Sequence, residues 1–322
     1  MIGYASGFAG KLEDYARFRA AHGFSGKHAA CLLRFDAYCR EFRPGARELD
    51  EPVVRGWFEH EVRSGAGILE HKAAAIRGLA RHVGRGAYVL PSNMIPKRPP
   101  FVPYIMDDDE LYRFFEAVDS FDNGLSDPLI PVVMPVMLRL MYSCGLRPGE
   151  ARRLEIGDVD PQTGEMLVRG SKRRKDRIIT ASADLVGMIS AYLPQRLAAA
   201  GGGAKDPLFV RADGSGVKET HLRRFVKDRW AAANPGVPPS ELPSLRPYDL
   251  RHRFASEALQ RWTDEGRNLY AMLPRLSAYM GHDQYKSTAY YIHILPDRLA
   301  KSPGVDWAAI DGVGLGAGLW ED

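Results

Sequence analysis

The stretch EMLVRGSKRRKDRIIT, residues 165–180, predicts the one small sheet of a chain whose other patterns are helical. The runs EMLVRG and RIIT flank the charged SKRRKD, an arrangement typical of two short strands joined by a basic hairpin turn. Apolar residues recur at helical spacing before these strands, in MDDDELYRFFEAV, and after them, in HLRRFVKDRWAAA and LRHRFASEALQRW. We therefore expect an α+β domain that is mainly α with a small antiparallel β-sheet.

The residues before this domain predict a separate, all-helical domain. The first 90 residues show repeated helical patterning, as in HAACLLRFDAYCREF, and no convincing strand. The following PSNMIPKRPPFVP holds five prolines, which fix φ and disfavour helix in the preceding residue. Asp107 then suits a helix N-cap, with Glu110 three residues on. We divide the chain into a helical domain over residues 1–90, a linker over 91–106, a second domain over 107–295 and a tail over 296–322.

Charge and cysteine content narrow the functional classes. The net charge of +4 is uneven: residues 1–100 hold 16 Lys and Arg against 10 Asp and Glu, hence about +6, and the rest about −2. A basic N-terminal part favours a polyanion as partner, although a solvated surface explains it as well. Cys31, Cys39 and Cys144 lack the spacing of metal ligands or of a disulfide framework. No signal peptide is visible, and the apolar run LIPVVMPVMLRLMYSC is too short to span a bilayer, so we expect a cytoplasmic protein with a buried core helix there.

Four separated segments carry the residue types of phosphate chemistry. They are GLRPGEARRL (145–154), the hairpin SKRRKDR (171–177), YDLRHRFA (248–255) and MGHDQYKSTAYYIHI (280–294). Each has an ordinary explanation when taken alone. Arg147 could pair with Glu150 across the first turn of a helix, the hairpin could be a solvated turn or a basic localisation signal, and the adjacent tyrosines could simply pack.

Together and in this order, the segments resemble the successive boxes of the tyrosine recombinases, the phage integrase family. The resemblance spans roughly residues 107–295, and the helical region with its linker is similar to the family's core-binding domain. It implies a two-domain clamp on double-stranded DNA, in which a tyrosine attacks a phosphodiester without metal or cofactor. The implied products are a 3′-phosphotyrosine and a free 5′-hydroxyl. It also implies a homotetramer on paired sites, with a monomer in the absence of DNA left open, and a nucleoid-associated location in the cytoplasm.

The resemblance assigns roles to four residues of these boxes. Arg147, in GLRPGE, and Arg251, in DLRH, would hold the non-bridging oxygens of the scissile phosphate. Lys172, in the hairpin, would be the general acid for the leaving 5′-oxygen, and His282, in MGH, would hydrogen-bond the phosphate. Physical chemistry supports the arginines independently, because a guanidinium stays charged and presents a planar fork that matches phosphate oxygens.

The nucleophile has to be chosen from two adjacent tyrosines. In the family it follows the GH box closely, with a His two residues beyond it. The distance from Gly281 and the pattern Y-x-H through His293 both select Tyr291. Tyr290 would then point about 100° away around a helix and pack.

Tyr248 departs from the family pattern, in which most members carry His at this place. A phenol with a pKa near 10 does not readily accept a proton at neutral pH, whereas an imidazole with a pKa of about 6.5 does. We expect Tyr248 to hydrogen-bond the phosphate or to pack beside it, with water or a lowered pKa of the nucleophile replacing the base. His252 is the nearest rival for an acid–base role, although its context predicts a core or helix neighbour.

Further residues are expected to support this chemistry. Glu150 and Asp249 would orient the arginines from behind. Candidate DNA contacts beside the hairpin are Arg173, Arg174, Lys175 and Arg177, for which an exposed turn is an equally good explanation. Arg153, Arg246 and His293 receive no role.

Two other functions stay open beside a site-specific recombinase or integrase. One is a catalytically impaired, recombinase-derived protein that binds a DNA sequence, and Tyr248 is the one feature in its favour. The other is a relaxing topoisomerase, for which no feature of the sequence argues. The tail, with Trp307 and Ile310, would either dock onto a neighbouring subunit or fray.

Overall fold

The computed structural model describes residues 3–24, 26–65, 68–95, 102–122, 126–170, 176–282, 288 and 291. The chain divides into two compact units, Met1–Pro99 and Pro100–Asp322. The division falls inside the proline-rich segment expected to be a linker, residues 91–106. Throughout the described part of the chain, no helix combines the length and the apolarity needed to cross a membrane.

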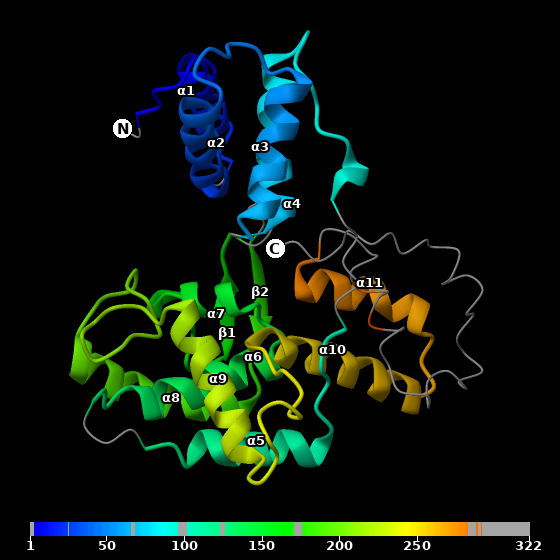
Figure 1. Ribbon diagram of the computed structural model, residues 1–322. Coiled ribbons are helices and arrows are strands. Elements are labelled where there is room, and N and C mark those ends of the chain that lie inside the picture. The colour runs from blue at the N-terminus through cyan, green and yellow to red at the C-terminus, as the bar shows by residue number, and fades with distance from the viewer. Residues whose placement is uncertain are drawn as a thin grey trace. The chain divides into compact units, whose positions relative to one another are not determined.

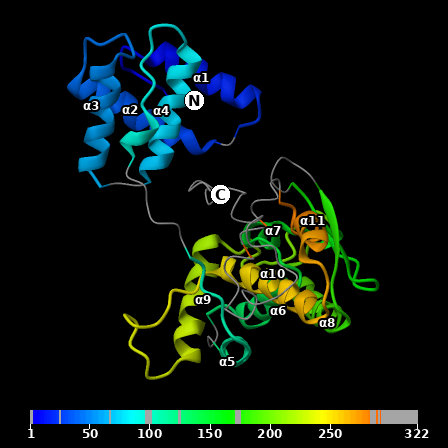
Figure 2. The same ribbon diagram turned by 90° about the vertical axis from the view of Figure 1, so that its right-hand side faces the viewer.

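The first unit consists of a cluster of helices (Figures 1 and 2). Asp50 begins one of them, because its side chain accepts a hydrogen bond from the backbone N–H of Val53. The rings of Phe35 and Trp57 meet edge to face at the centre, with centroids 5.6 Å apart. Its elements are α1 (Ala9–Ala21), α2 (Ala29–Phe42), α3 (Glu51–Arg63) and α4 (Leu69–Val83), with 3₁₀ turns at Gly26–His28 and Ser92–Met94. The described residues of this unit therefore confirm the all-helical prediction.

The second unit is mainly helical with one small sheet (Figure 1). Its elements are α5 (Asp108–Asp119), α6 (Ile130–Ser143), α7 (Pro148–Arg153), a 3₁₀ turn at Ile156–Asp158, β1 (Glu165–Val168), β2 (Arg177–Thr180), α8 (Ala183–Ala200), α9 (Glu219–Ala233), α10 (Pro247–Asp264) and α11 (Leu269–Met280). Asp107 caps α5 in a reciprocal capping box with Glu110, at the position that the sequence predicts. The predicted fold class is confirmed.

Helix α6 is the centre of the second unit's core. It contacts α5, α7, α8 and α10, and Figure 2 shows α10 beside it. Val133, Met137 and Leu140 are fully buried along it, as its apolar sequence predicts. The side chain of Arg139, also on α6, forms a bidentate ion pair with Asp119 of α5. Its Nη1 donates to Oδ1 (2.7 Å) and its Nη2 donates to Oδ2 (2.6 Å).

The two strands form an antiparallel pair in which Glu165 lies opposite Thr180 and Val168 opposite Arg177. The two predicted strands therefore pair as expected, and the turn between them, residues 171–175, lies outside the described part of the chain. Asp176 accepts a hydrogen bond from the backbone N–H of Gly170 (2.7 Å), which ties the two strand ends together before the turn.

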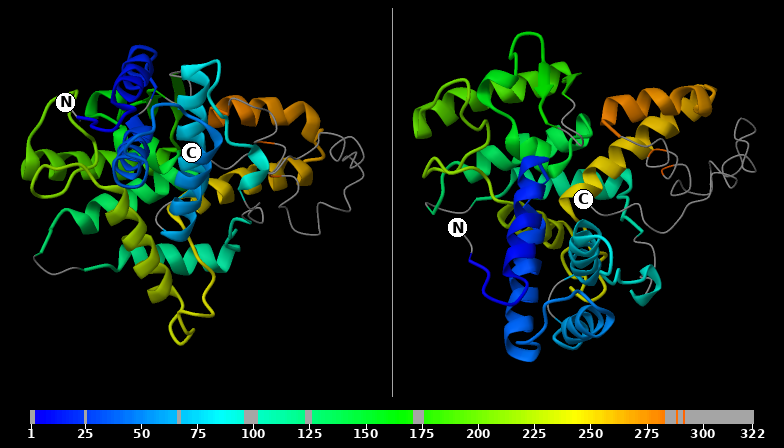
Figure 3. Two further views of the ribbon diagram at one scale, coloured as in Figure 1. Left: turned by 45° about the horizontal axis from the view of Figure 1, so that its top comes forward. Right: turned by 90° about the horizontal axis from the view of Figure 1, so that it is seen from above.

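Gly145 positions α10 against the end of α6. It has a φ of +60°, a value that favours glycine. A Cβ at this position would lie 2.5 Å from the ring of Phe254 on α10. Glycine at this position therefore allows both the turn of the chain and the close approach of α10. Helix α11 packs against α10, as Figure 3 shows.

Candidate active site

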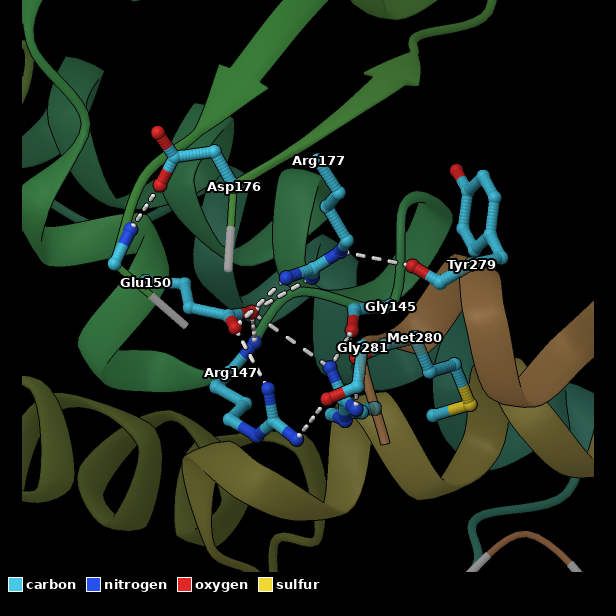
Figure 4. A network of polar contacts seen from close by, with 10 residues as sticks. Gly145, Arg147, Glu150, Asp176, Arg177, Tyr279, Met280 and Gly281 are labelled. Carbon is cyan, nitrogen blue, oxygen red and sulfur yellow. Dashed lines mark hydrogen bonds and ion pairs between the residues drawn. The ribbon is translucent and has the colours of Figure 1, made fainter. Parts of the chain in front are cut away.

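Three chain segments meet at the candidate site: the start of α7, the first turns of α10 and the end of α11 (Figure 4). Arg147 lies immediately before α7, and Pro148 at the first helical position favours a helix start there. The backbone N–H of Arg147 donates to Glu150 Oε2 (3.0 Å), and its Nη1 donates to Glu150 Oε1 (2.7 Å). The local pair that the sequence allows is therefore formed, and the Arg147 side chain is 14% exposed.

Arg251 reaches the site from α10 and is fully buried. Its Nη1 donates to the Gly145 carbonyl (2.6 Å) and its Nη2 to the Met280 carbonyl (2.7 Å). Burial lowers the pKa of Arg251, and the positive charge of Arg147 lowers it further. An arginine starts from a pKa above 12, so the group stays charged near neutral pH.

The last carbonyls of α11 are each bound by a different guanidinium. Arg177 Nε donates to Tyr279 O (2.8 Å), Arg251 Nη2 to Met280 O (2.7 Å) and Arg147 Nη2 to Gly281 O (2.9 Å). The carbonyls at a helix C-terminus have no partner within the helix and carry partial negative charge. Three arginines from three other segments thus cap the end of α11. Figure 4 shows Arg147 at the Gly281 carbonyl and Arg177 at the Tyr279 carbonyl.

Among the described residues, Glu150 is the carboxylate that lies at the centre of these arginines. It is 3% exposed and receives Arg177 through two parallel hydrogen bonds, Nη1 to Oε1 and Nη2 to Oε2, both 2.9 Å long. Arg251 Nη1 lies 3.7 Å from Glu150 Oε2. Burial alone would raise the pKa of Glu150, but hydrogen bonds from Arg177 and the charges of Arg177, Arg251 and Arg147 outweigh it and lower the pKa to about 2. Glu150 is therefore ionised at any physiological pH.

The segment after α11 begins with Gly281, whose φ of +65° ends the helix, and continues with His282. His282 Nδ1 lies 2.8 Å from the hydroxyl of Thr288, which is fully buried. The rings of His282 and Tyr291 are stacked, with centroids 6.1 Å apart. Burial lowers the pKa of His282 to about 2, and the charges of Arg251 and Arg147 contribute. The imidazole is therefore neutral in this state.

The hydroxyl of Tyr291 lies 3.1 Å from Nδ1 of His252. Tyr291 is 1% exposed, and burial raises its pKa while the charge of Arg251 opposes this shift. His252 is also buried, and burial with the charges of Arg246 and Arg251 lowers its pKa to about 3. Tyr248 lies one helical turn before His252, and the centroids of the two rings are 5.0 Å apart. Sequence reasoning left His252 without a role, although it directly follows Arg251 and precedes Arg253 in the same box.

Two expectations from the sequence need correction. The sequence makes Arg177 either a candidate DNA contact or part of an exposed turn, but its guanidinium points inward to Glu150 and Tyr279 and its side chain is 11% exposed. Asp249 was expected to orient the catalytic arginines, but its buried carboxylate binds Arg246, at 2.8 Å from the backbone N and 2.9 Å from Nη2. The error for Arg177 arises because spacing along the chain does not reveal which distant group a long side chain meets. The error for Asp249 has another cause, because its partner Arg246 is only three residues away and binds it in a capping box.

Several predicted residues lie outside the described part of the chain. They are Lys172, Arg173, Arg174, Lys175, Tyr290, His293 and the tail 296–322. Within the part that the structure describes, no group of three or more His, Cys, Asp or Glu side chains is arranged to hold a metal ion.

The site consists of two arginines, a histidine and a buried tyrosine around the capped end of α11, in the order along the chain that the sequence boxes predict. A model of the phage integrase family matches residues 105–298, which is more than half of the chain. This chain belongs to the phage integrase family. As a member of that family, it is a tyrosine recombinase, an enzyme of the class that cleaves and rejoins DNA.

Curated relatives agree with this assignment to the phage integrase family. A putative integrase/recombinase, y4rE of Sinorhizobium fredii, is 30% identical over 97% of this chain and 99% of its own length. The tyrosine recombinase XerC of Pelobacter propionicus is 30% identical over 71% of this chain and 69% of its own length. The family and these relatives together support the function of a site-specific recombinase or integrase.

Solved structures of integrase-type proteins share the fold. The XerH site-specific recombinase, in a post-cleavage complex with its palindromic difH substrate, superposes with a TM-score of 0.61 over 88% of this chain and 79% of that chain, at 18% identity. The integrase of the Tn1549 transposon, in complex with transposon right end DNA, has a TM-score of 0.61 over 87% of this chain and 94% of that chain, at 14% identity. At these identities the likeness concerns the fold alone.

Proposed function

We propose that this phage integrase family member cleaves one strand of double-stranded DNA through Tyr291 and rejoins it through a 3′-phosphotyrosine intermediate, without metal or ATP. The observation that carries the proposal is the set of guanidiniums of Arg147 and Arg251 around the end of α11, in the same buried cluster as Tyr291. The buried group combines three arginines with one ionised carboxylate, so it holds a net charge of about +2. A phosphodiester carries one negative charge and gains more in its transition state, which such a fixed positive field stabilises.

In the proposed reaction one bond from phosphorus to oxygen forms and another breaks. The Tyr291 oxygen attacks phosphorus and the bond from phosphorus to the 5′-oxygen breaks, so one phosphodiester replaces another. The proton for the departing 5′-oxygen would come from Lys172 and the Tyr291 proton would go to an acceptor. Because a phenolate is also a good leaving group, the 5′-hydroxyl of a partner strand can reverse the step, and no ATP is required.

The acceptor that the geometry favours is His252, because its Nδ1 lies 3.1 Å from the Tyr291 oxygen. Burial lowers the pKa of His252 to about 3, which leaves the imidazole neutral but also weakens it as a base, so the assignment rests on this distance. We expect His252→Phe, which keeps a ring in the core, to slow cleavage by roughly 100-fold at neutral pH. His252→Asn, whose side-chain oxygen can lie near the place of Nδ1, should lose less. Single-turnover cleavage rates of both variants provide the test, and equal rates for His252→Phe and the parent protein would remove His252 from the mechanism.

Tyr248 is proposed to pack beside His252 and to hydrogen-bond the phosphate rather than to act as the base. We expect Tyr248→Phe to reduce cleavage moderately, by about tenfold, the equivalent of one hydrogen bond to a charged group. Tyr248→His should retain or improve cleavage, because it supplies the imidazole that most family members carry. The measurement is the same single-turnover assay, in which a complete loss for Tyr248→His would mean that the phenol has a role of its own.

The partner we propose is double-stranded DNA bearing paired sites, with the protein assembling on it as a tetramer in the cytoplasm. The palindromic substrate of XerH presents the same half-site twice, which supports two protomers on each site; two such sites brought together would hold the tetramer. A relaxing topoisomerase with the same chemistry would act on a single site. A dependence of the reaction on two sites per DNA therefore separates the two functions.

The proposal is tested by trapping the covalent intermediate. The purified protein is incubated with a pool of nicked duplexes of randomised sequence, in which cleavage near the nick releases a short fragment and cannot be reversed. Protein that carries DNA is isolated under denaturing conditions, and the attached DNA is sequenced. A covalent band with one recurrent end sequence supports a site-specific recombinase, whereas specific binding without any covalent band supports the catalytically impaired alternative.

A further inference from the structure

We propose that Arg177 is a positioning residue for cleavage, which holds Glu150 and the end of α11 in place and makes no contact with DNA. This inference rests on the proposed function, because it concerns the same reaction. In sequence, Arg177 ends the basic hairpin SKRRKDR and looks like one more phosphate contact. Its contacts separate it from such a role.

The donors of Arg177 are directed into the protein. Nη1 and Nη2 donate to the two oxygens of Glu150, both at 2.9 Å, and Nε donates to the Tyr279 carbonyl at 2.8 Å (Figure 4). The edge of the guanidinium that could grip a phosphate with two parallel hydrogen bonds is therefore used by a carboxylate. A Cβ at Gly281 would lie 3.0 Å from Nη1 of Arg177, so the chain closes over the guanidinium from that side as well.

Arg177 also limits how strongly the Glu150 carboxylate attracts Arg147 and Arg251. Glu150 binds Arg147 at 2.7 Å, and Arg251 Nη1 lies 3.7 Å from it. A buried carboxylate without Arg177 would attract those two guanidiniums more strongly and shift them from the geometry that the reaction needs. By occupying both oxygens, Arg177 lets Glu150 orient Arg147 and Arg251 without displacing them.

The contact with Tyr279 extends this role to the segment that carries His282 and Tyr291. Arg177 is the first residue of β2, directly after the hairpin that holds Lys172 in the sequence. Its hydrogen bond to the end of α11 ties that strand to the helix immediately before His282. One side chain thus fixes the spacing between the hairpin strand, the phosphate-binding arginines and the nucleophile segment. A misplacement of about 1 Å in such an arrangement costs roughly 100-fold in rate.

The test compares Arg177→Met with the parent protein on the nicked duplex whose sequence the trapping experiment recovers. We expect the single-turnover cleavage rate at saturating protein to fall by roughly 100-fold. The Kd for the labelled duplex and its salt dependence should stay unchanged. A lost phosphate contact would instead weaken binding and reduce the slope of log K against log salt concentration by about 1. Either that reduced slope or a parental cleavage rate overturns the proposal.

Two further variants keep the test decisive. Arg139→Met removes a bidentate pair with Asp119 in the same unit, away from the site, and should change neither cleavage nor binding. Arg177→Lys keeps the charge but cannot make the two parallel bonds, so it should bind DNA normally and cleave at an intermediate rate. If thermal denaturation shows that Arg177→Met is unfolded, Arg177→Lys takes its place in the test.

The failure of this proposal can be told apart from the failure of the proposed function. A parent protein that forms no covalent band would contradict the proposed function. The salt dependence of binding to a duplex of arbitrary sequence would still decide whether Arg177 contacts DNA.

Discussion

Tyr291→Phe is expected to abolish the covalent protein–DNA complex completely while leaving DNA binding intact. The substitution removes only the oxygen that would attack phosphorus, and no other group can form the same bond. The phenol is 1% exposed and its hydroxyl lies 3.1 Å from His252 Nδ1 and also accepts a hydrogen bond from Arg251, so the folded state loses hydrogen bonds worth roughly 1 kcal/mol each. A loss of all cleavage would therefore reflect chemistry rather than unfolding.

The matched control for this experiment is the adjacent tyrosine. Tyr290→Phe makes the same chemical change one residue away and is expected to cleave like the parent protein. Both variants are assayed on the nicked duplex by denaturing electrophoresis, and DNA binding is measured in parallel. A covalent band that persists in Tyr291→Phe and vanishes in Tyr290→Phe would reverse the assignment of the nucleophile.

Glu150→Gln is expected to destabilise the protein by roughly 3–5 kcal/mol, the usual cost of leaving buried charges without their partner. The amide cannot accept the two parallel bonds from Arg177 and leaves Arg147, Arg177 and Arg251 close together with no counter-charge. Urea denaturation at neutral pH measures the difference in the free energy of unfolding. Asp119→Asn is the control: it removes the carboxylate of the half-exposed pair with Arg139, which should cost about 1 kcal/mol or less.

The same carboxylate predicts how stability depends on pH. The pKa of Glu150 is lowered to about 2 from an ordinary 4.5, so the folded protein holds this group ionised more firmly than the unfolded chain does. Its contribution is fully present above about pH 4.5 and is lost as the pH falls toward 2. The gap in stability between the parent protein and Glu150→Gln should therefore be constant from neutral pH to about pH 5 and narrow below that. A gap that stays constant down to pH 3 would contradict the lowered pKa.

The sequence predicts those parts of the molecule that depend on local pattern. The antiparallel strands β1 and β2, the buried helix α6 and the capping box at Asp107 follow from β-branched residues, periodicity and cap chemistry, and all three are formed. The boxes that carry Arg147, Arg251 and His282 are visible as well, because their order along the chain is distinctive.

The parts that escape the sequence depend on contacts between distant segments. Arg177 belongs to a run of basic residues that look equivalent in sequence, and only the register of β2 against α7 and α11 turns it inward. Asp249 is the exception, because its partner Arg246 lies three residues before it, and the sequence left open which of the nearby arginines the carboxylate binds. His252 lies beside Tyr291 only because α10 and the segment after α11 come together.

Under the proposed mechanism, the capped end of α11 would link the binding of phosphate thermodynamically to the docking of the segment that carries Tyr291. Arg147 and Arg251 each hold one of its carbonyls, and the same two side chains would hold the scissile phosphate. If a bound phosphate stabilises the docked segment by some factor, the docked segment must strengthen phosphate binding by that same factor. Docking of this segment and affinity for the phosphate therefore share one coupling free energy. A substitution in α11 that makes no contact with DNA can change both.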